Sequence, residues 1–201
     1  MSRYVVGLTG GIACGKSNLS TALRAEGAQV IDADAISRAA TAQGGEALPA
    51  LRAWLGDRVF RGETLDRAAL ADIVFQDPAA LKRLNGLVHP IVLEKMRREM
   101  DAYPGIVVLD APLLYECGLE PWCDEVWCVY LPQREQIRRL TQRDGITCRA
   151  ALARIHAQMP AREKARRADR VILTTGDPAE SAAQAVALWR ELVQKLKGDM
   201  P

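Results

Sequence analysis

Eight residues near the N-terminus combine glycine, lysine and serine in a spacing suited to holding phosphate. They read G-x-x-x-x-G-K-S from Gly10 to Ser17, between an apolar run and a segment compatible with a helix. The glycines let backbone N–H groups wrap around phosphate oxygens at the helix N-terminus. Lys16 would reach the β- and γ-phosphates, and the Ser17 hydroxyl would ligate Mg²⁺. The stretch predicts a nucleoside triphosphate site; the alternative is a glycine-rich turn that happens to precede a helix.

The loop residues that we expect to bind ATP lie in one short segment. They are Gly10, Gly11, Ala13, Cys14, Gly15, Lys16, Ser17 and Asn18. Cys14 has two interpretations. Its thiol is either activated by bound phosphate and the helix N-terminus, or it is a small residue tolerated in a tight loop, which we favour.

Two carboxylates follow the second apolar run, in VIDAD from Val30 to Asp34. The carboxyl ends of parallel strands open onto the ligand crevice, so we expect Asp32 and Asp34 near the phosphates. A carboxylate there can accept a hydroxyl proton or orient the hydroxyl for in-line attack on a γ-phosphoryl group. We favour this role over helix capping for Asp34, and both roles stay open for Asp32.

Arginines are dense between Pro132 and Ala168, where nine occur. A small kinase has to keep water away from the phosphoryl group, and a mobile lid that carries arginines closes the site and neutralises charge. We therefore interpret 132–168 as a lid, with Arg143 in TQRD as its leading candidate. Most of the other arginines are expected on solvated helix faces.

Five apolar runs without strict alternation predict buried strands of a parallel sheet covered on both faces by helices. They are Tyr4 to Thr9, Gln29 to Asp32, Ile106 to Ala111, Glu125 to Leu131 and Arg170 to Thr175. The fold class is therefore α/β, a P-loop NTPase of three αβα layers with a parallel five-stranded sheet, plus a helical insertion and a lid. The predicted core is 1–42, 104–131 and 169–201.

Helices are predicted between the strands. The segment Lys16 to Glu26 should end at Gly27, and aspartate before proline at 77–78 and 177–178 should cap two further helices. Apolar residues at helical spacing from Ala185 to Leu196 mark a C-terminal helix packed on the core. Residues 43–103 show no convincing strand, only helical pattern broken at Gly56, Gly62, 77–78 and 89–90, and we interpret them as a helical insertion.

The composition favours a small-molecule enzyme. With 27 basic and 25 acidic residues among 201, the chain lacks the strong basic field of a dedicated nucleic-acid binder. Five cysteines without a CxxC pair argue against a disulfide framework or structural zinc. No apolar run is long enough for a signal peptide or a membrane span. We expect a cytoplasmic monomer that binds neither nucleic acid nor membranes.

The reaction class is narrowed by motifs that the chain lacks. No NKxD stretch for guanine occurs, and the run that ends in Asp110 is followed by Ala111 and Pro112 rather than by a second acid. These absences argue against a switch GTPase and a motor ATPase. Two alternatives to our preferred kinase stay open: a kinase for another small alcohol or a nucleoside monophosphate, and a nucleotide-dependent regulatory module.

An ordered series of motifs closely resembles the dephospho-coenzyme A kinases over nearly the whole chain. The series comprises GLTGGIACGKS (7–17), VIDADAISR (30–38), LNGLVHP (84–90), APLLYE (111–116), QRD (142–144), QMP (158–160) and ADRVI (168–172). The resemblance implies transfer of the ATP γ-phosphoryl group to the ribose 3′-hydroxyl of dephospho-CoA, which gives CoA and ADP as the last step of CoA biosynthesis, with Mg²⁺.

The resemblance also implies roles for single residues. Asp34 is similar to the base that engages the 3′-hydroxyl, and Arg143 to the lid residue that contacts ATP. With Lys16 they make up the expected catalytic set. Thr9, Asp34, Arg38 and His89 are expected to contact the acceptor, and residues 43–103 correspond to the family's CoA-binding subdomain. From the residues alone, His89 before proline is more typical of a packed or capping residue.

Three departures from the family pattern bear on the site. The family usually has Gly-Ser where this chain has Ala13 and Cys14, Thr where it has Asn18, and often Asn where it has Thr175. Because backbone groups supply the phosphate contacts, the loop is expected to tolerate Ala13 provided that it adopts the local backbone angles. The side-chain amide of Asn18 is expected to donate to phosphate.

Overall fold

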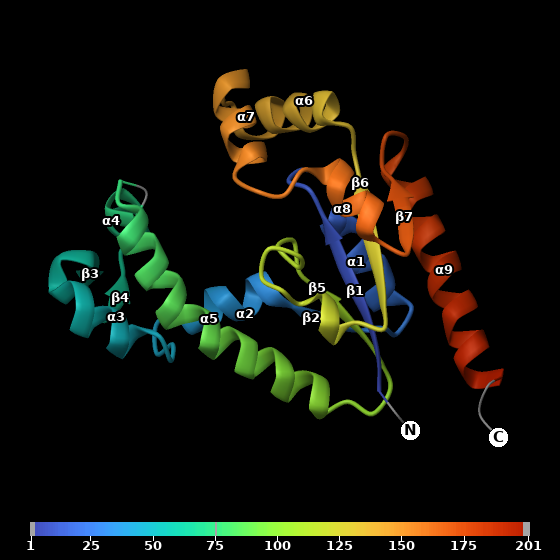
Figure 1. The fold of residues 1–201 in the computed structure, drawn as a ribbon, viewed down its shortest axis with the longest axis horizontal. Helices are drawn as coiled ribbons and strands as arrows, with labels where there is room; N and C mark the ends of the chain where they lie inside the picture. The colour runs from blue at the N-terminus through green and yellow to red at the C-terminus, as the bar shows by residue number, and fades with distance from the viewer. Residues whose placement is uncertain (1–2, 75, 199–201) are drawn as a thin grey trace. The chain divides into compact units, whose positions relative to one another are not determined.

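The computed structural model describes residues 3–74 and 76–198, and the chain forms two compact units. The first unit combines Met1–Ile31 with Tyr103–Pro201, and the second is Asp32–Ala102. Figure 1 shows the elements of both units in chain order by colour. No helix within the described ranges is both long and apolar enough to cross a membrane.

A five-stranded sheet in the order β2-β5-β1-β6-β7 forms the centre of the first unit. Its strands are β1 (Tyr4–Gly10), β2 (Gln29–Asp32), β5 (Ile106–Asp110), β6 (Glu125–Tyr130) and β7 (Arg170–Leu173). The pairings of β1 with β5, β1 with β6 and β6 with β7 are parallel. The predicted α/β class with a parallel sheet is confirmed, and each predicted strand ends within two residues of the observed end.

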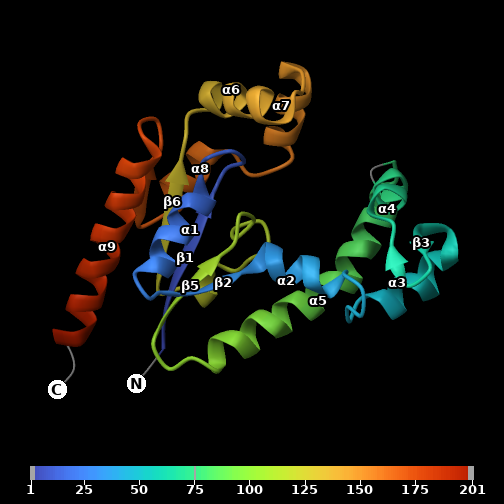
Figure 2. The ribbon, with the colours of Figure 1, turned by 180° about the vertical axis from the view of Figure 1, so that it is seen from behind.

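Helices cover both faces of this sheet. On one face α1 (Lys16–Ala25) and α9 (Pro178–Gly198) pack against each other, and α8 (Ala161–Arg167) lies against β1 and β6 on the opposite face (Figures 1 and 2). Trp189 and Leu192 of α9 join the buried core under β1 and β6. The predicted apolar stripe of the C-terminal helix is therefore confirmed as core packing.

The predicted helix boundaries also hold. Gly27 adopts a left-handed φ of 84°, just after the end of α1. The Asp77 and Asp177 carboxylates each accept a hydrogen bond of 2.8 Å from the backbone N–H two residues ahead. These aspartates stabilise the first turns of α5 (Pro78–Asp101) and α9, where proline has no N–H to satisfy.

Two helices that follow β6 pack against the glycine-rich loop. Leu140 of α6 (Gln133–Asp144) and Ile155 of α7 (Cys148–His156) form a small buried cluster with Ala151. Ile12 and Ala13 of the loop pack against this cluster. A movement of α6 and α7 would therefore disturb packing at the loop.

The second unit is mostly helical, with α5 as its longest element. Its other elements are α2 (Ala33–Ala40), α3 (Leu48–Leu55), a 3₁₀ turn (Gly56–Val59), β3 (Phe60–Arg61), β4 (Thr64–Leu65) and α4 (Arg67–Val74). α2, α3 and α4 all pack on α5.

Two expectations for this region were wrong. β3 and β4 form an antiparallel hairpin that turns at Gly62 with a φ of 61°, whereas no strand was expected, because two-residue strands are too short to show a periodic pattern. α5 also runs unbroken through Pro90, where a break was expected. The proline ring would meet the carbonyl of Gly86, and glycine leaves that peptide free to tilt while three packed helices hold α5.

Candidate functional site

The glycine-rich loop joins the end of β1 to the start of α1 and allows close backbone approach. A Cβ on Gly10 would lie 2.6 Å from the Val129 carbonyl oxygen, and a Cβ on Gly11 would lie 2.8 Å from Gln136 Nε2. Gly15 takes a left-handed φ of 83° immediately before α1. The first N–H groups of α1 have no partner within the helix, and a helix N-terminus favours anions, so this turn is a candidate phosphate site.

Ala13 is strained in this loop. Among the described residues it is the one non-glycine residue with a positive φ, at 61°. An L-residue in the left-handed region brings its Cβ close to the neighbouring carbonyl oxygen, which costs about 1 kcal/mol. Ala13 therefore does adopt the backbone angles that the loop requires, and this left-handed conformation costs folding free energy.

An Ala13→Gly variant is expected to raise the free energy of unfolding by about 1 kcal/mol, because glycine adopts this φ without strain. Urea denaturation of the two proteins measures the difference. An Ala22→Gly variant in α1 is the matched control and should lose stability, because glycine is unfavourable inside a helix. If the Ala13→Gly protein were less stable than the parent, the claim that Ala13 is strained would be wrong.

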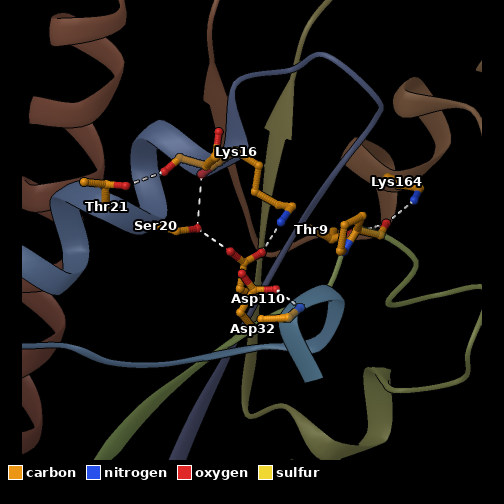
Figure 3. A network of polar contacts seen from close by, with 10 residues as sticks. Thr9, Lys16, Ser20, Thr21, Asp32, Asp110 and Lys164 are labelled. Carbon is orange, nitrogen blue, oxygen red and sulfur yellow. Dashed lines mark hydrogen bonds and ion pairs between the residues drawn. The ribbon is translucent and has the colours of Figure 1, made fainter. Parts of the chain in front are cut away.

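Lys16 and a buried carboxylate form the polar centre of the site (Figure 3). Lys16 Nζ donates to one oxygen of Asp110 at the end of β5, and Ser20 Oγ donates to the other. Ser20 also contacts the Lys16 carbonyl oxygen at 3.1 Å. The Asp110 side chain is only 3% exposed, and a buried carboxylate is stable only when it is paired and hydrogen-bonded. Asp110 therefore holds the ammonium group of Lys16 at the carboxyl edge of the sheet.

Ser20 was missed from the sequence, and Asp110 was considered only as the end of an apolar run that lacks a second acid. A signal for Ser20 exists, because it lies four residues after Lys16 and shares its helix face. No local pattern shows that Lys16 at the start of α1 pairs with Asp110 at the end of β5.

Cys14 is buried, with 1% of its surface exposed, and Gln136 Nε2 lies 3.6 Å from its Sγ. Burial raises the pKa of the Cys14 thiol to about 11. A thiol with this pKa is protonated at neutral pH and is a weak nucleophile. These properties fit the small tolerated residue rather than the activated thiol.

Ser17 and Asn18 are exposed at the first turn of α1. The Asn18 side-chain amide donates to the Pro178 carbonyl oxygen at 2.8 Å. This differs from the expectation that it donates to phosphate, because the packing of α9 on α1 brings a backbone acceptor within its reach. Thr175, where the family often has Asn, is also exposed.

The arginine that contacts the loop is Arg139, which the sequence did not single out. Its guanidinium donates to the Thr174 carbonyl oxygen and lies 3.5 Å from the Ala13 carbonyl oxygen. Arg143 lies one turn further along α6, exposed, with its Nε 2.7 Å from Asp144 Oδ1. Asp144 also binds Arg154, and these pairs lower the pKa of the Asp144 carboxyl. Arg143 is therefore engaged on the protein surface.

Thr9 is fully buried at the end of β1. Its hydroxyl donates to the Pro112 carbonyl oxygen at 3.1 Å and so ties β1 to the segment that follows β5. The hydroxyl is thus committed to a protein contact, whereas the sequence predicts a contact between Thr9 and the acceptor.

The remaining predicted site residues lie in the second unit. Asp34 and Arg38 are exposed on α2 at a spacing of four residues, which puts them on one face of the helix. Asp32 accepts a hydrogen bond of 2.8 Å from the Ala35 N–H and so caps α2. His89 is exposed in the middle of α5, so it is neither packed nor capping.

Comparisons with known proteins agree on one family. The family model described as dephospho-CoA kinase matches residues 4–180. The chain is 45% identical to the dephospho-CoA kinase of Anaeromyxobacter dehalogenans over 94% of this chain and 92% of that protein. It is 44% identical to the dephospho-CoA kinase of Geobacillus kaustophilus over 92% and 95% of the two chains.

Solved structures share the fold. A Thermus thermophilus crystal structure is 36% identical and superimposes with a TM-score of 0.82, over 96% of this chain and 99% of that chain. The dephospho-CoA kinase from Campylobacter jejuni is 26% identical, with a TM-score of 0.66 over 94% and 97% of the chains.

Proposed function

This chain belongs to the dephospho-CoA kinase family and is an ATP-dependent kinase for dephospho-CoA, and we propose that it transfers the γ-phosphoryl group directly to the ribose 3′-hydroxyl. The observation that supports this mechanism is the ion pair between Lys16 and Asp110 next to the glycine-rich loop. Cys14 is a nucleophilic residue type within the loop, but its thiol is buried and protonated. This supports direct in-line transfer without a phosphorylated enzyme intermediate.

The loop and Lys16 supply the electrostatic part of the reaction. Backbone N–H groups of the loop and of the first turn of α1 hold the phosphates of ATP. When ATP binds, the Lys16 ammonium donates to the β- and γ-phosphate oxygens and neutralises charge that develops during transfer. Asp110 keeps the ammonium at the strand ends in the free protein, which preorganises the site for the nucleotide.

Magnesium fits the residues near Lys16. The Ser17 hydroxyl is exposed at the first turn of α1, and Asp110 supplies a carboxylate in the same unit. No cluster of three His, Cys, Asp or Glu suited to a metal occurs among the described residues. Few protein ligands suit Mg²⁺, which takes most of its oxygens from phosphate and water. We propose Ser17 as the protein ligand; when bound, Mg²⁺ would neutralise phosphate charge.

The acceptor is proposed to react through Asp34 and to contact Arg38 and His89. Exposure of Arg38 and His89 supports this, because a guanidinium and an imidazole at the surface can donate hydrogen bonds to an anionic substrate, and Asp34 shares the helix face of Arg38. Asp34 would accept the proton of the 3′-hydroxyl as it attacks. Arg143 is proposed to leave Asp144 and reach ATP when 132–168 closes as a lid.

The compartment, oligomeric state and binding partners of the enzyme are also proposals. We propose that it works in the cytoplasm as a monomer and binds small molecules but no nucleic acid. The near balance of 27 basic and 25 acidic residues supports the last point.

An acceptor assay tests the function. With ATP and Mg²⁺, dephospho-CoA is expected to give CoA and ADP in equal amounts, and nucleoside monophosphates are expected to give none. Coupled detection of ADP, with mass spectrometry of the acceptor product, measures both. Release of ADP with a monophosphate and none with dephospho-CoA would instead identify a nucleotide kinase.

A further inference from the structure

Lys164 of α8 is a fully buried lysine outside the phosphate loop, with 0% of its surface exposed. Its Nζ donates to the Pro112 carbonyl oxygen at 2.5 Å, the carbonyl that Thr9 also contacts (Figure 3). The same Nζ contacts Glu116 at 2.8 Å. Lysine is almost never fully buried unless it is paired, because its ammonium loses the hydration that it has in water. The Lys164 ammonium is therefore stable in the interior only because both its charge and its N–H donors have partners.

The contacts of Lys164 converge on one peptide. The Pro112 carbonyl oxygen accepts both from Lys164 and from Thr9 Oγ1, at 3.1 Å, so both of its lone pairs are engaged. The described residues contain no cis peptide bond. In a trans peptide the N–H points opposite to the carbonyl, so the Leu113 N–H faces away from Lys164.

This peptide lies at the carboxyl edge of the sheet. It begins two residues after Asp110, which holds Lys16. The Leu113 side chain is 39% exposed, one of the few large apolar side chains of the described residues that are open to solvent. The peptide therefore offers a backbone donor on the side opposite Lys164, and Leu113 adds an exposed apolar side chain next to it.

A second set of contacts ties the same segment to α8. Glu116 also accepts a hydrogen bond of 2.8 Å from the Met159 N–H. Arg167 lies 4.3 Å from the centre of the Tyr115 ring and pairs with Glu120. α8 thus holds the segment 112–120 through charged groups as well as packing.

We propose that Lys164 is a positioning residue for the acceptor: it fixes the Pro112–Leu113 peptide so that the Leu113 N–H and side chain bind dephospho-CoA. The proposal rests on the function proposed above. Lys164 faces away from the substrate and acts through the peptide, so its loss should affect the acceptor and spare the nucleotide.

The test is a Lys164→Met variant, which keeps the length of the side chain but removes the charge and the donors. The value of kcat/KM for dephospho-CoA is expected to fall on the order of 100-fold, as for small misplacements of a substrate. The Kd of ATP, measured by calorimetry, should change less than about twofold, because Lys16 and the loop are untouched. An Arg166→Met variant on the same helix, where the arginine is exposed and pairs only with Glu163 among the described residues, is the control and should match the parent protein.

A Glu116→Gln variant keeps the test decisive if Lys164→Met fails to fold. It retains an acceptor for Met159 but removes the charge that pairs with Lys164, and it should weaken use of dephospho-CoA in the same selective way. The double variant should lose less than the product of the two single losses, because both act through one pair. Equal losses toward ATP and dephospho-CoA, or none, would show a merely structural role and overturn the proposal. A parent protein that does not phosphorylate dephospho-CoA would refute the proposed function itself.

Discussion

A Lys16→Met variant is expected to lower kcat on the order of 1,000-fold. Lys16 supplies the only ammonium that the loop motif directs at the transferring phosphoryl group, and removal of one preorganised donor of developing charge typically has an effect of this size. Single-turnover measurement of CoA formation with saturating ATP separates this chemical effect from weaker binding. Activity within tenfold of the parent protein would contradict the role of Lys16.

The same variant is expected to lose about 3 kcal/mol of unfolding free energy in the absence of nucleotide. Asp110 would remain buried beside Ser20 without its counter-charge. A Lys16→Met, Asp110→Asn double variant should recover most of this stability, because asparagine is neutral and still accepts from Ser20. It should not recover activity. Urea denaturation of the three proteins, with the parent as reference, separates the structural role of the pair from the catalytic role of the ammonium.

An Asp34→Asn variant is expected to lower kcat on the order of 1,000-fold, within the range typical of general bases. Asparagine cannot accept the proton of the 3′-hydroxyl. The proposed role of Asp34 is toward the acceptor hydroxyl and not toward the nucleotide, so the Kd of ATP should stay within about twofold of the parent value. Rapid-quench kinetics and calorimetry measure the two quantities.

An Asp32→Asn variant is the matched control. Asp32 caps α2 through the Ala35 N–H, and asparagine caps a helix about as well as aspartate. This variant should therefore retain stability and activity. If Asp32→Asn removed turnover and Asp34→Asn did not, the base would be Asp32, and the assignment of Asp34 would be wrong.

Local chemistry was enough to predict most of the architecture. Each of the five strands was predicted. The strands β1, β5 and β6 are buried and form continuous apolar runs, whereas the edge strands β2 and β7 are partly exposed and not buried as expected. The glycine-rich loop was predicted because its function depends on backbone N–H groups, and glycine spacing reports where the backbone must curl. Capping by Asp77 and Asp177 followed from neighbours two residues away. In each case the interacting groups are close in the chain.

Contacts between segments that are distant in the chain could not be predicted from local sequence patterns. The bond from Lys16 to Asp110 joins residues 94 positions apart, and the bond from Lys164 to Pro112 spans 52 positions. Arg139 reaches the loop while Arg143 binds Asp144, although both arginines lie on one helix four residues apart. Because residues four apart share one helix face, the point along α6 at which the loop packs decides between them.

The sheet, the phosphate loop and the family could be predicted from the amino-acid sequence, because they depend on apolar periodicity, glycine spacing and ordered motifs. The contact of Arg139 with the loop, the pairing of Asp110 with Lys16 and the burial of Lys164 are visible only in the folded chain. The physical reason is that a buried charge is stable only beside its partners, and the fold brings those partners from remote parts of the chain.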